Sequence, residues 1–141
     1  MENIIEELRI GNYISFINRN GEYHIPSTHP LKIYSISVFK VEVCQINENF
    51  AEVEKMTILD VNDLVGIPIT EKWLIKLGFK FLGLMNFYGI DLFDDICLIA
   101  IPDGKAIAIS QLKCKDINID CKFVHQLQNL YFVLTGKTLM I

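Results

Sequence analysis

The sequence predicts an α+β protein: a mostly antiparallel β-sheet with two helices, at about residues 70–77 and 124–135, packed on one face. Three observations predict this class. Short runs of alternating apolar and polar residues, separated by turn signals, recur along the chain. Two segments place apolar residues at helical spacing. The run Pro102-Asp-Gly-Lys105 lies between two apolar runs, which is a strong hairpin signal.

The first elements read as strands joined by turns. Residues 13–17 (YISFI) alternate as a strand does, and residues 18–21 end in Asn-Gly, which readily supplies the positive φ of a tight turn. Residues 22–25 are the expected return strand. Two prolines within residues 26–30 mark a loop.

Residues 31–46 give the longest strand signal. Its alternation slips by one residue between Val38 and Phe39, which would move the apolar face to the other side, so a bulge or bend is expected there. Residues 47–49 form a turn, and residues 50–59 return as another strand.

The first helix, at about residues 70–77, has clear end signals. Thr70 is a natural N-cap, and Gly78 is a natural stop. Its apolar side chains fall on one face, which should lie on a sheet: Trp73, Leu74 and Leu77.

The remaining elements complete the sheet and close the chain. Residues 79–93 favour a strand with breaks, residues 96–101 and 106–110 favour a hairpin, and residues 117–123 favour one more strand. The closing helix ends at Gly136, and a final short strand is expected after it. Its apolar stripe consists of Val124, Leu127, Leu130, Tyr131 and Leu134.

Length and composition favour one globular domain over residues 1–141. Hydrophobic residues make up 51% of the chain, so it can bury a core without disulfides or a structural metal. No cysteine pair has CxxC spacing, and the acidic start lacks the basic region of a signal peptide. We therefore expect reduced thiols and a location in a cytoplasm.

The charge balance argues against an independent nucleic-acid-binding protein. The net charge is −4, and Arg9 and Arg19 are the only arginines. An acidic surface is compatible with competition for a basic groove on another protein. Residues 79–101 are apolar, but charges and glycines interrupt them, so neither a membrane-spanning helix nor a membrane partner is expected.

Three blocks carry a resemblance to a known family: LRIGNYI (residues 8–14), IPITEKWLIKLGF (residues 67–79) and VHQLQNLYFVLTG (residues 124–136). They resemble a family of small uncharacterised proteins from Bacteroidetes phages and prophages, and the third block is the most specific. The family order is similar too: a short β start, a Thr-capped Trp helix, strands and a closing helix. The chain departs from the family in the length of residues 81–120.

This resemblance implies a phage- or prophage-encoded interaction protein without enzymatic activity. Some small mobile-element proteins from such hosts inhibit bacterial immunity. By that analogy we expect an anti-CRISPR inhibitor of the type VI-B RNA-guided nuclease. The implied partner is a host protein or ribonucleoprotein, namely that effector with its guide RNA, and a homodimer is a further expected assembly. No cofactor is implied.

One candidate interaction site is the aromatic segment at residues 79–95. Its rings exceed what one small core needs, and an exposed remainder would mark an interface; the alternative is a wholly buried core. The proposed contact residues are Phe81, Phe87, Tyr88, Asp91, Phe93, Asp94 and Asp95, next to the core candidate Phe79. The acids, with Asp103, suit a patch that mimics nucleic-acid charge or an ordinary solvated face.

A second candidate is the polar face of the closing helix. His125, Gln128 and Asn129 share a face with Phe132 because they lie three, four and seven positions apart. The functional interpretation is a recognition face. The structural alternative is that His125 and Asn129 hydrogen-bond to loop backbone and hold residues 8–14 against the helix.

No metal or catalytic site is expected. Cys114, Cys121 and His125 lack a fourth ligand and paired ligand spacings, and a buried core thiol explains Cys121 better. His24 and His29 read as loop residues, because no catalytic motif accompanies them. Two other functions remain open: a structural or accessory phage protein, and a small RNA-binding module. The module would use a basic patch of Lys113, Lys115, Lys122 and Lys137 beside Tyr131.

Overall fold

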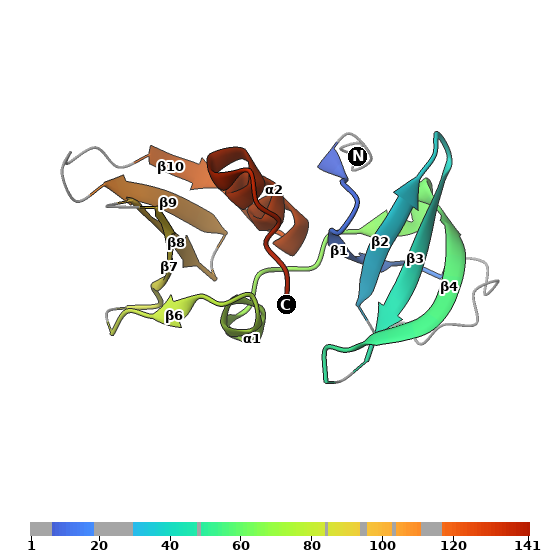
Figure 1. The fold of residues 1–141 in the computed structure, drawn as a ribbon, viewed down its shortest axis with the longest axis horizontal. Helices are drawn as coiled ribbons and strands as arrows, with labels where there is room; N and C mark the ends of the chain where they lie inside the picture. The colour runs from blue at the N-terminus through green and yellow to red at the C-terminus, as the bar shows by residue number, and fades with distance from the viewer. Residues whose placement is uncertain are drawn as a thin grey trace. The chain divides into compact units, whose positions relative to one another are not determined.

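The computed structural model describes residues 7–18, 30–47, 49–83, 85–93, 96–102, 104–110 and 117–141. They fall into two compact units, Met1–Ile67 and Pro68–Ile141. In the described residues each unit contains one five-stranded antiparallel sheet, and both α-helices belong to the second unit (Figure 1). The α+β class, mostly antiparallel strands with two helices, is confirmed. The single-domain organisation expected for residues 1–141 stays a prediction.

The first unit is a meander with the strand order β4-β3-β2-β1-β5. Strand β1 pairs with two neighbours: Tyr13 and Ile14 pair with β2, whereas Ser15 and Phe16 pair with β5. The sheet therefore changes partner halfway along β1. The strands are β1 (Tyr13–Phe16), β2 (Leu31–Ile36), β3 (Lys40–Ile46), β4 (Glu52–Asp60) and β5 (Leu64–Val65), with the 3-10 helix η2 (Val61–Asp63) before the last.

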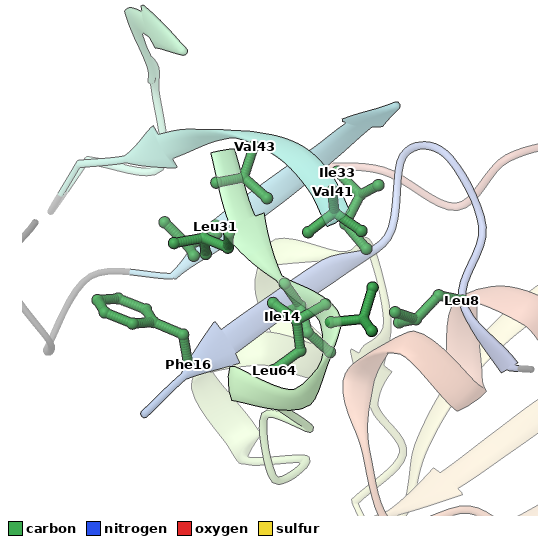
Figure 2. Packing of buried hydrophobic residues seen from close by; sticks show 10 residues of the cluster. Leu8, Ile14, Phe16, Leu31, Ile33, Val41, Val43 and Leu64 are labelled. Atoms are coloured by element: carbon green, nitrogen blue, oxygen red, sulfur yellow. The ribbon is translucent and has the colours of Figure 1, made fainter. Parts of the chain in front are cut away.

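Alternation along these strands builds the core of the first unit. Leu31 and Ile33 of β2 and Val41 and Val43 of β3 point inward, and ten buried side chains meet on that side (Figure 2). Burying one such aliphatic or aromatic side chain contributes about 1.5–3 kcal/mol. The buried residues are Leu8, Ile14, Phe16, Leu31, Ile33, Val41, Val43, Leu59, Val61 and Leu64.

The bend expected near Val38 and Phe39 is present, but it is a complete reversal of the chain. Residues 31–46 form a hairpin, β2 and β3, with these two residues at its tip. The N–H and the hydroxyl of Ser37 both donate to the carbonyl of Lys40, at 2.8 and 2.9 Å. The turn is inconspicuous in the sequence because it contains none of the glycine or asparagine that usually mark tight turns.

The second unit has the strand order β10-β9-β8-β7-β6. The hairpin expected around residues 102–105 is confirmed, with Gly104 at φ +104° and its N–H bonded to the carbonyl of Ile101 at 3.1 Å. The strands are β6 (Lys80–Phe81), β7 (Tyr88–Phe93), β8 (Ile96–Ile101), β9 (Lys105–Ser110) and β10 (Ile117–Asp120). The break expected in residues 79–93 is therefore the gap between β6 and β7.

Helix α1 (Glu71–Lys76) forms for the local reasons that the sequence indicates. The hydroxyl of Thr70 accepts from the N–H of Trp73 at 3.4 Å, and Gly78 follows the helix at φ +94°. Trp73, Leu74 and Leu77 are buried, as expected for the face that packs on the unit.

Helix α2 (Val124–Thr135) lies against the second sheet (Figure 1). At its start the side-chain carbonyl of Gln126 accepts from the N–H groups of Lys122 and Phe123, at 2.9 and 3.2 Å. At its end Gly136 adopts a left-handed conformation with φ +70°. Its N–H donates to the carbonyl of Phe132 at 2.7 Å, so the predicted stop is confirmed.

The prediction of a final short strand after Gly136 is wrong. Residues 137–141 have no strand structure. Instead Leu139 is buried, and its carbonyl accepts a hydrogen bond from Nε2 of Gln128 at 2.9 Å. A side chain of α2 thus bonds a backbone carbonyl that would have paired with another strand in the expected sheet. The turn and return strand expected across residues 18–25 fall mostly outside the described residues, as do His24 and His29.

No helix among the described residues is long and apolar enough to cross a membrane.

Gly89 of β7 offers a test of packing in the second sheet. A Cβ there would lie 3.1 Å from Sγ of Cys97 and 3.1 Å from Cδ1 of Leu82. We expect Gly89→Ala to lower the free energy of unfolding by about 1–3 kcal/mol because the added methyl overpacks this site. Chemical denaturation measures the loss. Adding Leu82→Ala should recover part of it, and strictly additive losses would contradict this account.

Candidate interaction surfaces

The aromatic segment at residues 79–95 divides between core and surface. Phe79 and Tyr88 are buried, Phe87 is half-buried, and Phe81 and Phe93 are exposed by 57% and 49%. Asp91 is exposed, whereas Asp94, Asp95 and Asp103 lie outside the described residues. Two of the five rings are thus available to a partner, and the role of this segment as an interface stays a prediction.

Tyr88 has a structural role. Burial raises the pKa of its phenol, and a hydrogen bond to the carboxylate of Glu71 acts in the same direction. Its ring lies 5.5 Å from that of Phe81, measured between centroids. Tyr88 therefore links β7 to α1 and supports one side of Phe81 while it is itself only 4% exposed.

The polar residues predicted on the closing helix differ in their burial. His125 is fully buried, Gln128 is 3% exposed, and Asn129 is half-buried. The ring of His125 stacks on Phe123, with 5.8 Å between centroids and 10° between planes. Gln128 bonds the backbone of Leu139. Neither His125 nor Gln128 is therefore exposed. The structural alternative, in which His125 and Asn129 hold residues 8–14 against the helix, stays a prediction.

Of the candidate metal ligands, the structure describes Cys121 and His125. Both are buried, and burial raises the pKa of the Cys121 thiol to about 12. Cys114 lies outside the described residues. Within the described ranges, no group of three or more His, Cys, Asp or Glu side chains is placed to hold a metal ion.

The first sheet has a second, exposed face with large apolar side chains, which we call the outer face. It lies opposite the core, and it includes Tyr34, Met56 and Ile58, exposed by 38%, 46% and 57%. The hairpin tip adds Val38 and Phe39, exposed by 74% and 71%. Lys32, Ser35 and Glu42 complete the part of the outer face used below.

A β-bulge in β2 places two neighbouring side chains on this face. Ile33 pairs with Val43, but the next pair is Ser35 with Glu42, so Tyr34 is the extra residue. Tyr34 and Ser35 are both exposed. The bulge therefore adds an aromatic ring to the outer face without disturbing the core positions on either side.

Three polar side chains form a cluster on the outer face. Nζ of Lys32 lies 2.5 Å from Oε1 of Glu52, and the hydroxyl of Tyr34 donates to Oε2 of the same carboxylate. The Lys32 ammonium also lies 5.5 Å from the centre of the Tyr34 ring. Lys32 and Glu52 come from β2 and β4, so the pair reaches across β3.

The cluster changes the acidity of its members. Hydrogen bonds from Lys32 and then from Tyr34 lower the pKa of Glu52. The hydrogen bond to Glu52 raises the pKa of Tyr34 to about 12. Cys44 lies in β3 between Lys32 and Met56 in the strand register, is only 3% exposed, and has its pKa raised chiefly by burial.

One feature of the sequence indicates this face. Residues 56–59 read Met-Thr-Ile-Leu, so apolar side chains occur on both faces of one strand. In the structure Leu59 enters the core while Met56 and Ile58 remain exposed. The Lys32–Glu52 pair had no such signal, because its residues are 20 positions apart.

Comparison with known proteins gives no relative: no protein-family model, no curated protein and no solved structure matches the chain.

The phenol of Tyr34 provides a test of the cluster. Its raised pKa favours the neutral phenol in the folded state, so its contribution to stability is complete below the ordinary tyrosine pKa near 10 and is lost as pH rises through about 12. Absorbance at about 295 nm should show a late-titrating tyrosine. In Glu52→Gln that phenol should titrate closer to its ordinary value.

Tyr34→Phe assigns the signal, because Tyr88 also titrates late. If the Tyr34→Phe spectrum keeps every late component, or Glu52→Gln leaves the titration unchanged, the cluster does not exist in solution.

Proposed function

We propose that this chain is a non-enzymatic phage- or prophage-encoded protein that acts in the host cytoplasm by binding and inhibiting a host factor. The proposed target is the type VI-B RNA-guided nuclease with its guide RNA. The kind of target comes from the family resemblance, and the structure supports the general mode, which is docking through an exposed surface.

The observation that carries the proposal is the pair of apolar side chains at the hairpin tip. Val38 and Phe39 are both more than 70% exposed. The bonds from Ser37 to Lys40 close the turn, and the carbonyl of Phe39 accepts from the N–H of Val61 at 2.9 Å. The backbone that carries the two side chains is therefore already ordered, so a partner that covers them does not have to order the turn on binding.

The polar groups of the outer face also suit binding. Lys32, Tyr34 and Glu52 lie together on an open sheet face. Such a face does not exclude water from the reacting atoms of a substrate, so it suits binding better than catalysis. Lys32 and Tyr34 both bond the carboxylate of Glu52, and these bonds stabilise the arrangement of the three side chains. A charged pair beside exposed Met56 and Ile58 resembles a protein interface, which combines apolar contact area with a few oriented polar groups.

The net charge favours a protein that normally holds RNA. Such a protein has a basic groove, and a chain with a net charge of −4 is attracted to it over a distance of about 10 Å at moderate salt. The same charge disfavours direct RNA binding. Of the lysines in the alternative basic patch, Lys122 and Lys137 are exposed, and Lys113 and Lys115 lie outside the described residues.

The direct experiment co-expresses the chain with a type VI-B effector, its guide RNA and a targeted phage. We expect phage plating to be restored and the chain to co-elute with the effector. If the chain neither restores plating nor co-elutes with the effector, the proposed target is wrong. Retardation of RNA by the chain alone at low salt would favour the RNA-binding alternative instead.

Replacement of the hairpin tip tests the surface. We expect Val38→Ser with Phe39→Ser to weaken binding to the effector by about 100-fold, because two buried apolar side chains contribute about 1.5 kcal/mol or more each. Thermal unfolding should hardly change, since both side chains are exposed. Isothermal titration calorimetry measures the affinity.

The matched control is Phe81→Ser with Phe93→Ser, which removes the two exposed rings of the second unit. It should keep most of the affinity. The opposite ranking of the two double variants would assign the interface to residues 79–95.

A further inference from the structure

We infer that Tyr34 and Glu52 form a recognition site for an arginine side chain of a partner protein, and that Lys32 occupies this site in the free chain. We call the two residues the arginine site. The identity of the partner rests on the proposed function, whereas the preference for arginine is a property of the site itself.

The geometry of Lys32 shows that the site accepts a cation. Its ammonium lies 2.5 Å from one oxygen of the Glu52 carboxylate and 5.5 Å from the centre of the Tyr34 ring. A carboxylate beside an aromatic face is the combination that attracts lysine and arginine side chains, through a charge-assisted hydrogen bond and a cation–π interaction. The chain therefore carries its own occupant for this site.

Arginine suits the site better than lysine does. Its guanidinium is planar, so it can stack on a ring and bond a carboxylate with two parallel N–H groups. The Glu52 carboxylate has about four acceptor positions, of which Lys32 and Tyr34 use one on each oxygen. The hydrogen bond from Tyr34 fixes the carboxylate beside the ring, so the acceptor and the stacking surface are positioned before a partner arrives.

Displacement of Lys32 exchanges one cation for another at the same carboxylate. The Lys32 side chain is only 11% exposed, so it must swing out of a mostly covered position, and its released ammonium regains water. The Glu52 side chain is 43% exposed and Tyr34 is 38% exposed, so an incoming group reaches both. Met56 pairs with Cys44, which in turn pairs with Lys32. Met56 therefore offers apolar contact to the methylene groups of an arginine.

The chemistry of the site selects a protein over the other large ligands. A carboxylate repels phosphate, and a neutral phenol carries no charge that attracts it. Neither a nucleic-acid backbone nor an anionic lipid headgroup therefore fits here. Proteins that bind nucleic acid expose arginines along their grooves. The inference thus gives the acidic chain a specific contact in place of a general attraction.

The test uses the full chain and three fluorescent peptides of alternating glycine with arginine, lysine or citrulline, at low salt. Fluorescence anisotropy should show the arginine peptide binding about 5-fold more tightly than the lysine peptide, because only arginine gives the bidentate, stacked contact. The citrulline peptide, which lacks the charge, should not bind measurably.

Five variants separate the site from net charge. Glu52→Gln should weaken arginine-peptide binding about 10-fold, whereas Glu42→Gln, an equal change of charge on the same face, should alter it less than about 2-fold. Lys32→Met should strengthen binding about 3-fold by removing the internal occupant, and Lys40→Met should not. Tyr34→Leu keeps the carboxylate but removes the ring, and should reduce the preference for arginine over lysine.

Equal effects of Glu52→Gln and Glu42→Gln, or of Lys32→Met and Lys40→Met, would reduce the site to general electrostatics and overturn the inference. Absence of arginine-peptide binding would overturn it as well. These results do not depend on the nuclease. Failure to co-elute with the effector removes the proposed target, and failure in the peptide assay removes the arginine site.

Discussion

The structure of the first unit depends on the two-residue period of its strands. Burial of Leu31, Ile33, Val41 and Val43 fixes the register of β2 against β3, because a one-residue slip would expose the whole apolar set. The same register decides which side chains are exposed to solvent. Once the core side is fixed, Lys32 and Glu42 must point outward, and β4 must add Met56 and Ile58 beside them. The candidate docking surface is therefore a consequence of core packing, although none of its exposed residues contributes to the core.

The bulge at Tyr34 modifies this rule at one point. It brings a ring to the outer face, next to a lysine from the same strand and a glutamate from β4. Cys44 lies in the row between Lys32 and Met56, and it is almost fully buried although its neighbours along β3, Lys40 and Glu42, are exposed on the same face. The side chains of the cluster thus account for a buried thiol on an exposed face. The raised pKa of Cys44 follows chiefly from the loss of water around it.

The sequence predicted those features that depend on near neighbours. Thr70, Gly78 and Gly136 mark helix ends by interactions within four residues, and the structure confirms all three. It also predicted the hairpin at Gly104, whose turn residues are distinctive. It did not predict features that depend on pairing across strands. Lys32 and Glu52 are unremarkable in the sequence, and their contact requires the registers of both β2 with β3 and β3 with β4. The segment at residues 79–95 is conspicuous in the sequence because it holds five aromatic residues, yet part of it enters the core.

The hairpin tip is the strongest argument that the first unit meets another macromolecule. Val38 and Phe39 both have negative φ, so the backbone of this turn does not require glycine, asparagine or aspartate. The two side chains have no place in the core, since each is more than 70% exposed. Replacing them with polar turn residues would leave the hydrogen bonds of Ser37 and Val61 intact, because those bonds use only the backbone at the tip. The folded unit therefore gains almost nothing from these two side chains, and for this reason the proposed function assigns the contact with a partner to them.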